Sequence, residues 1–419
     1  RPVPRARRSL LVPPSPATPL LQGLRILELA NVLAGPATGM FCAELGAEVL
    51  KLEHPQGGDP TRGWTVPEEA PWGGVSAYFA ATNWGKKSLT VDLTKPEGQA
   101  IAQGLAAQAD VVIAAFKPGD DARLGVDAAR LRATNPGLIY AQVSAYGIED
   151  PRPGFDAVIQ AETGFMHLNG DPEGPPTKMP VALMDLLAAH QLKEALLLAL
   201  LKRERFGEGS HIQIALFDAA LASLANQATN HLVAGRNPGR MGSGHPNVVP
   251  YGTLYGAKDG KHFVLAIGTD RQFAALAEAL GLGELAEDPR FTKNGARVQH
   301  RDALDEILHR AFGAQDSEAL ERALNAAKVP FGPVNDLTEA FAHPRAQHTA
   351  LEGTLANGQS LRAVSSLAFQ GEIPRQRPSA PPALGAHTDE VLQANLNYSS
   401  QQLAELRAQG VLGASPSTH

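Results

Sequence analysis

The chain of 419 residues contains a single cysteine, Cys42. One cysteine excludes an intramolecular disulfide and any cysteine-based metal cluster. The residue lies in a run of small and apolar side chains, which predicts a buried apolar role. Such sparse use of cysteine is typical of a protein from a reducing compartment.

The sequence also lacks an excess of positive charge and a long apolar run. Lys and Arg number 37 against 43 Asp and Glu, giving a net charge of −6, so no basic surface for nucleic acid is expected. The most apolar segment, residues 181–201, contains an Asp, a His, a Lys and a Glu. We therefore expect neither a nucleic acid nor a membrane as a partner.

Three familiar catalytic motifs are missing. The sequence contains no G-x-S-x-G of serine hydrolases, no H-E-x-x-H of zinc proteases and no G-x-G-x-x-G of dinucleotide-binding folds. Its 13 histidines are scattered without a short ligand spacing, so no metal is expected. By elimination, a carboxylate is the best available nucleophile.

The first half of the chain alternates apolar strands with helices. Strands are expected at 24–30, 48–53, 87–93, 110–115 and 138–144. This alternation predicts an α/β fold with a doubly wound, Rossmann-like sheet. Ligands of such sheets bind at the carboxyl ends of the strands.

Changes in composition and in the expected secondary structure along the chain predict the domain boundaries. Residues 20–225 form the large α/β domain, residues 226–335 a smaller α+β domain, and residues 336–419 return to complete the large one. Residues 1–19 contain four arginines and no acid, interrupted by prolines. We expect a disordered tail there, and a cytoplasmic protein. The alternative is a targeting segment, which would make the protein mitochondrial.

Asp185 precedes an apolar helix expected over residues 186–202. The helix is apolar on most of its faces, so protein must cover it. Its dipole and free amide groups would keep a carboxylate at this position ionised and nucleophilic. Asp is also a common helix cap, and the spacing alone leaves both interpretations open.

Three loops are candidates for binding a ligand. The turn at 31–39 follows the first strand, and the turn at 116–119 follows the fourth, with Arg123 nearby. Each is either a nucleotide-binding loop or an ordinary start of a helix. In the third loop, Gly242 and Gly244 flank Ser243. That composition predicts a mobile loop that closes over a ligand, or a plain linker between domains.

From about residue 20 to 413 the chain resembles the class III CoA-transferases, the CaiB/BaiF family. The stretches that carry the resemblance lie at 21–29, 33–36, 45–53, 58–62, 83–89, 116–119 and 385–391. The resemblance implies an interlocked homodimer. Long crossings at 340–385 without an evident partner in one subunit agree with this. The resemblance also implies that Asp185 is the nucleophile rather than a helix cap.

The family's reaction implies a covalent mechanism. Asp185 would attack the thioester of an acyl-CoA, forming a mixed anhydride and then an aspartyl-CoA thioester. Residues 242–252 and 291–301 most resemble the branch that transfers CoA from succinyl-CoA to glutarate. The expected substrates are therefore succinyl-CoA and a small dicarboxylate, and CoA is the only cofactor implied.

The resemblance also implies which residues bind the substrate. His54 stands where relatives often have arginine, and Ala115 where some have asparagine, so the phosphate contacts differ here. The loop over the substrate would comprise Gly242, Ser243, Gly244 and His245. The residues implied to bind CoA are Leu33, Ala34, His54, Val91, Asp92, Leu93, Thr94, Ala115, Phe116, Lys117, Arg123, Arg152, Phe155 and Leu216.

Two other functions are carried as alternatives. The family includes α-methylacyl-CoA racemases, which have a histidine at the position of Phe155. A phenyl ring cannot transfer a proton, so racemisation ranks below transfer. The second alternative is a module that binds CoA without catalysis.

Overall fold

The computed structural model describes residues 18–69 and 73–414, which divide into two compact units. The first unit contains the described residues up to Ile159, then Val181–Leu224 and the residues from Gln347 onward. The second contains Gln160–Pro180 and Ala225–Ala346.

These boundaries differ from the predicted ones. Residues 160–180, expected in the large domain, group with the second unit, and that unit also continues past residue 335 to Ala346. Of the segment predicted as a tail, 1–19, residues 1–17 lie outside the described residues.

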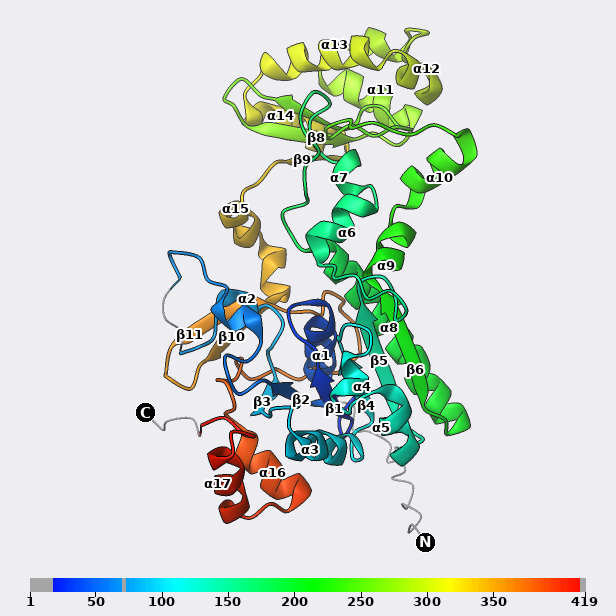
Figure 1. Cartoon of the computed structure of the whole chain (residues 1–419). Coiled ribbons are helices and arrows are strands. Elements are labelled where there is room, and N and C mark those ends of the chain that lie inside the picture. Colours follow the sequence, from blue (N-terminus) through cyan, green and yellow to red (C-terminus); the bar gives the residue numbers. More distant parts are fainter. Residues whose placement is uncertain (1–17, 70–72, 415–419) are drawn as a thin grey trace. The chain divides into compact units, whose positions relative to one another are not determined.

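Six parallel strands form the sheet of the first unit (Figure 1). Their spatial order, β3-β2-β1-β4-β5-β6, is that of a Rossmann sheet, and it reverses between β1 and β4. The predicted parallel α/β sheet is therefore confirmed. The strands are β1 (Arg25–Leu29), β2 (Glu48–Glu53), β3 (Lys86–Thr90), β4 (Val111–Ala114), β5 (Ile139–Ser144) and β6 (Ser210–Ala215).

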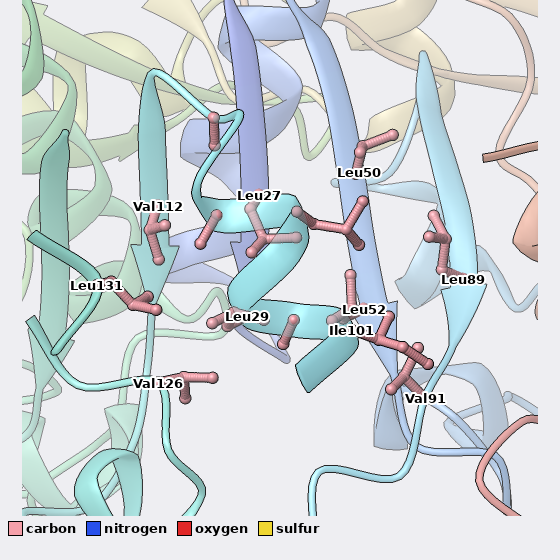
Figure 2. Packing of buried hydrophobic residues seen from close by; sticks show 14 of the residues in the cluster. Leu27, Leu29, Leu50, Leu52, Leu89, Val91, Ile101, Val112, Val126 and Leu131 are labelled. Atoms are coloured by element: carbon pink, nitrogen blue, oxygen red, sulfur yellow. The ribbon is translucent and has the colours of Figure 1, made fainter. Parts of the chain in front are cut away.

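Helices cover both faces of this sheet. Apolar side chains of β1 to β4 pack against Ile101 of α3 (Pro96–Ala106), as Figure 2 shows. The C-terminal helices α16 (Thr388–Leu396) and α17 (Ser400–Ala408) join the same core. On the opposite face, α1 (Ala34–Glu44) packs against α8 (Leu183–Phe206). Burial on both sides is why these strands read as nearly continuous apolar runs.

The returning chain packs on the first unit. Strands β10 (Ala350–Thr354) and β11 (Ser360–Val364) pair antiparallel. Their leucines share a core with Trp84 and with α2 (Ala77–Ala80). Ser366 then donates to the buried carboxylate of Glu44. The expectation that this crossing has no partner within its own chain is therefore wrong for these residues.

The second unit combines a small antiparallel sheet with helices. Its sheet has the order β7-β8-β9, and its core is built around buried phenylalanines from both strands and helices. Its elements are α7 (Phe165–Leu168), α10 (Ala225–Ala234), β7 (Tyr251–Gly256), β8 (His262–Ala266), α11 (Asp270–Ala279), η2 (Gly283–Ala286), α12 (Asn294–Gln299), α13 (Arg301–Gly313), α14 (Ser317–Ala326), β9 (Phe331–Pro333) and α15 (Leu337–Ala342).

Short elements complete the chain. A polar side chain begins one of them: Asp127 accepts from the amide of Arg130 and starts α5. The remaining elements are η1 (Pro60–Gly63), α4 (Asp120–Arg123), α5 (Ala128–Thr134), α6 (Asp156–Glu162), α9 (Leu216–Ser223) and η3 (Pro344–His348).

Candidate active site

The carboxyl edge of the sheet gathers most of the segments predicted to bind CoA. Leu33 and Ala34 follow β1, His54 follows β2, and Ala115 follows β4. The order of strands reverses between β1 and β4, and a crevice for ligands opens at such a point. The segments after β1 and β4 therefore occupy the position where a Rossmann sheet binds a nucleotide.

Two further predicted segments lie at the same edge. Val91, Asp92, Leu93 and Thr94 follow β3 directly, and Asp92 lies 3.9 Å from the Nε2 atom of His54. Phe116 and Lys117 continue the segment after β4, and Arg123 ends α4. The side chain of Arg123 is exposed and pairs with Asp120 at 2.9 Å. It can exchange that partner for a phosphate without uncovering a buried charge.

The segment after β5 carries two other predicted residues. Arg152 stacks over the ring of Tyr146, with its guanidinium carbon 3.9 Å from the ring centre. Phe155, just before α6, is 65% exposed, whereas Leu216 at the start of α9 is only 5% exposed. The structure therefore offers Phe155 to a ligand and keeps Leu216 in the core.

Asp185 lies in the first turn of α8, which begins at Leu183 rather than after Asp185. The capping position belongs to Ala182, and no side chain caps the helix. The interpretation of Asp185 as a helix cap is therefore wrong. No residue in the described part of the chain donates a hydrogen bond to its carboxylate, which leaves the oxygen atoms available for chemistry.

A second carboxylate, Asp156, lies beside this helix start. Its side chain is 8% exposed and accepts from the amide of Met184 at 2.7 Å. Burial, and then the charge of Asp156, raise the pKa of Asp185 to about 7. The helix dipole was expected to keep Asp185 ionised, but burial and the neighbouring charge outweigh it. Near neutral pH Asp185 is therefore a partly protonated and more basic carboxylate.

Tyr78 of α2 completes this group. Its ring meets Trp64 edge-on, with 5.1 Å between the ring centres. Burial raises its pKa, and the charges of Asp185, Asp156 and Asp59 raise it further. The hydroxyl of Tyr78 therefore stays protonated and can donate a hydrogen bond. It is close enough to these carboxylates for their charges to raise its pKa.

Sequence reasoning missed both Asp156 and Tyr78. Asp156 directly follows Phe155, which was singled out, and an acid beside a candidate contact was the available signal. Tyr78 has no such signal, because only the packing of α2 brings it near α8.

The predicted substrate loop, Gly242, Ser243, Gly244 and His245, lies in the second unit. There it is held at several points, whereas its composition predicts a free loop. The amide of Gly242 donates to Gly170, and that of His245 donates to Tyr251. Gly242 has a φ of 57°, whereas Gly244 is not among the positive-φ residues.

The described residues also bear on metal, thiol and membrane chemistry. No group of three or more His, Cys, Asp or Glu side chains there is arranged to hold a metal ion. Burial raises the pKa of the Cys42 thiol to about 12, so this thiol is unreactive. None of the described helices is long and apolar enough to cross a membrane.

Comparison with known proteins identifies the family. The model of CoA-transferase family III matches residues 21–388. Succinate–glutarate CoA-transferase of Agrobacterium fabrum is 40% identical over 382 residues, covering 89% of this chain and 95% of that protein. Human succinyl-CoA:glutarate CoA-transferase is 33% identical over 399 residues, covering 94% and 90% of the two chains.

A solved structure agrees. The crystal structure of a CaiB/BaiF family protein from Brucella suis superimposes with a TM-score of 0.77 at 37% identity, covering 90% of this chain and all of that one. The resemblance found in the sequence is thereby confirmed, and with it the class of enzyme. The chain belongs to CoA-transferase family III.

Proposed function

We propose that this enzyme transfers CoA from succinyl-CoA to a small dicarboxylate such as glutarate, with Asp185 as the nucleophile. The observation that carries the proposal is the state of Asp185. It is a partly buried carboxylate with a pKa of about 7, and it accepts no hydrogen bond from the described residues. A basic carboxylate with free oxygen atoms attacks a thioester more readily than one saturated by donors.

The first half of the reaction moves CoA onto the enzyme. A carboxylate oxygen of Asp185 attacks the thioester carbon of succinyl-CoA, the C–S bond breaks, and CoA leaves as a thiolate. The product on the enzyme is a mixed anhydride. The thiolate then attacks the aspartyl carbonyl carbon, which forms an aspartyl-CoA thioester and releases succinate.

The second half reverses these steps with the acceptor. A carboxylate oxygen of the acceptor attacks the aspartyl thioester carbon and displaces the thiolate. The thiolate then attacks the acceptor's acyl carbon in the new anhydride, which releases the product thioester and restores the Asp185 carboxylate. Each step exchanges one acyl bond for another, so the thioester energy is conserved without ATP.

The proposed contacts to CoA are those that gather at the carboxyl edge of the sheet. Leu33 and Ala34 lie at the amino end of α1, where free amide groups favour an anion. Lys117 and Arg123 supply positive charge after β4. His54, which follows β2 and stands where relatives often have arginine, is a further proposed contact. The names of the relatives supply the choice of succinyl-CoA and glutarate.

We also propose that the enzyme is an interlocked homodimer. Part of the support is an apolar surface on α8, where Leu197, Leu198, Leu201 and Phe206 are 41–69% exposed. A soluble monomer rarely leaves several large apolar side chains of one helix in water, and a second copy would cover them. The cytoplasm stays the proposed compartment, with the mitochondrion as the alternative.

The test of the proposed activity is direct. The purified enzyme is incubated with succinyl-CoA and a panel of carboxylates, and the CoA esters formed are identified by mass. Transfer to a dicarboxylate that is lost in Asp185→Asn supports the proposal. Binding of succinyl-CoA without any exchange of CoA would favour the alternative of a module that binds CoA without catalysis. Uptake of deuterium at the α-carbon of a 2-methylacyl-CoA would instead revive the racemase.

A further inference from the structure

The turn between β1 and α1 contains a strained residue. Val32 has a φ of 69°, in the left-handed region. A β-branched side chain is strongly disfavoured there, so surrounding contacts must hold the residue in place. The turn lies at the carboxyl edge of the sheet, where Leu33 and Ala34 are proposed to meet CoA.

Asp59 supplies the first of these contacts. Both oxygen atoms of its carboxylate lie near the amide nitrogen of Val32, at 3.2 and 3.3 Å. Asp59 is fully buried and also accepts from the amide and the hydroxyl of Thr61, at 3.0 and 2.8 Å. Burial opposes its ionisation, but Lys51 and the Thr61 donors outweigh burial and hold the pKa of Asp59 below its usual value.

Lys51 of β2 holds Asp59 and the strand end together. Its ammonium group is fully buried and lies 3.0 Å from Asp59 and 3.1 Å from Glu28. It also donates to the carbonyl oxygen of Ala30 at 2.7 Å. The last carbonyl before the turn and the amide of Val32 are thus held by one ion pair. Asn31 is the only residue between the two anchored positions.

Packing leaves this turn little freedom. A Cβ atom built on Gly35, in the first turn of α1, would lie 2.4 Å from the Cβ atom of Ala30. Helix and strand therefore approach each other closely at the turn. Leu33 caps α1 without a side-chain hydrogen bond, so the conformation of Val32 sets the direction in which the first amides of the helix point.

We infer that Asp59 and Lys51 are positioning residues for the CoA-binding turn. Their buried ion pair holds Val32 in its left-handed conformation, so that Leu33 and the amino end of α1 are arranged for CoA before it binds. Prearrangement of this kind strengthens binding because the ligand does not have to order the turn. The inference rests on the proposed function only for the identity of the ligand.

The experiment compares Asp59→Asn with the double variant Asp59→Asn/Val32→Gly. Asn removes the charge and one acceptor, so binding of CoA, measured by titration calorimetry, should weaken on the order of tenfold. The KM for succinyl-CoA should rise with it, and kcat should change less. Glycine adopts a positive φ without strain. The double variant should therefore recover most of the lost affinity.

The control is Glu44→Gln, at the other end of α1. Glu44 is a carboxylate 3% exposed that accepts from Ser365 and Ser366. This variant should lower the melting temperature without changing the affinity for CoA. If Asp59 has only a structural role, Asp59→Asn should also lower the melting temperature without changing the affinity for CoA. That result would overturn the inference. So would a loss of affinity that Val32→Gly does not recover.

Hydrogen exchange in the absence of CoA separates this inference from the proposed function. Amides at 31–35 should exchange faster in Asp59→Asn than in the wild type, and unchanged exchange would overturn the inference. If the wild type binds no CoA, the proposed function fails, and exchange still decides whether Asp59 fixes the turn. Should Asp59→Asn not fold, Thr61→Val removes only the hydroxyl donor to Asp59 and takes its place in the same comparison.

Discussion

Asp156 holds the helix that carries Asp185 and at the same time opposes its ionisation. Its carboxylate accepts the amide of Met184, one residue before Asp185, at 2.7 Å. Its negative charge, added to burial, raises the pKa of Asp185 to about 7. The same side chain thus fixes the position of the proposed nucleophile and adjusts its basicity.

The rate of transfer should therefore follow the ionisation of Asp185. Only the carboxylate attacks, so kcat/KM should rise with pH to a plateau above about 7. Asp156→Asn removes the charge but keeps an oxygen atom for the Met184 amide. The midpoint of the pH–rate profile should then move to lower pH. Asp218→Asn, on an exposed carboxylate of α9, is the matched control and should leave the midpoint unchanged.

Asp185→Asn should reduce transfer by about a thousandfold or more, because it removes the attacking oxygen. Treatment of the wild type with succinyl-CoA and hydroxylamine should modify Asp185, read by peptide mass spectrometry. Substantial exchange by the purified variant would exclude Asp185 as the nucleophile.

The same variant should also change stability in a pH-dependent way. The pKa of Asp185 is higher in the folded chain than its usual value, so its ionised form opposes folding. This penalty is absent below the unfolded pKa and complete above about 7. Asp185→Asn should raise the melting temperature at pH 8 and leave it nearly unchanged near pH 4. An equal shift at both pH values would contradict the raised pKa.

Arg123→Ala should raise the KM for CoA esters more than it lowers kcat. A contact to phosphate is made equally in the ground and transition states, so its loss weakens binding uniformly. Arg130→Ala is the matched control, since Arg130 is a similarly exposed arginine that pairs with Asp127 three residues earlier. If kcat falls while KM holds, Arg123 acts on the reacting end of the substrate.

Gly242→Ala should slow transfer and increase the fraction of acyl-CoA lost to hydrolysis, if the turn shields the acyl-enzyme from water. Gly242 needs its positive φ of 57°, which alanine resists. Gly239→Ala is the control, because a Cβ atom there would meet nothing within 4 Å. Wild-type values for both rate and hydrolysis would mean that the turn only connects its neighbours.

Leu198→Glu should weaken the proposed dimer, since it places a charge on the exposed apolar face of α8. Light scattering should report the change in mass, and Ala404→Glu, on the exposed side of α17, should not cause it. Two interlocked chains cannot separate while both stay folded, which gives a second expectation. Tagged and untagged wild-type dimers should exchange subunits only after unfolding.

The sequence allowed β1 to β5 to be predicted because these strands are buried on both faces, whereas β6, which is exposed at alternate positions, was missed. The strand predicted at 48–53 has the bounds of β2. The start of α8 was placed three residues late, because no capping side chain marks Ala182.

The sequence could single out one carboxylate beside an apolar helix, but it could not single out residues that act together through contacts between distant segments. Asp185 stands out beside its apolar helix. Asp59, Lys51 and Glu28 act through contacts between different strands and loops, so their roles depend on the register that pairs Glu28 with Lys51. No local pattern in the sequence encodes that pairing.

Asp156 and Asp185 lie close in sequence to the two points where the chain passes between the first and the second unit. The chain leaves the first unit after Ile159 and re-enters it at Val181. Asp156 therefore lies three residues before the exit, and Asp185 four residues after the return. The hydrogen bond from Met184 to Asp156 ties the two ends of this excursion together. This hydrogen bond lies beside Asp185, so both of these connections to the second unit lie near the residue on which the proposed chemistry depends.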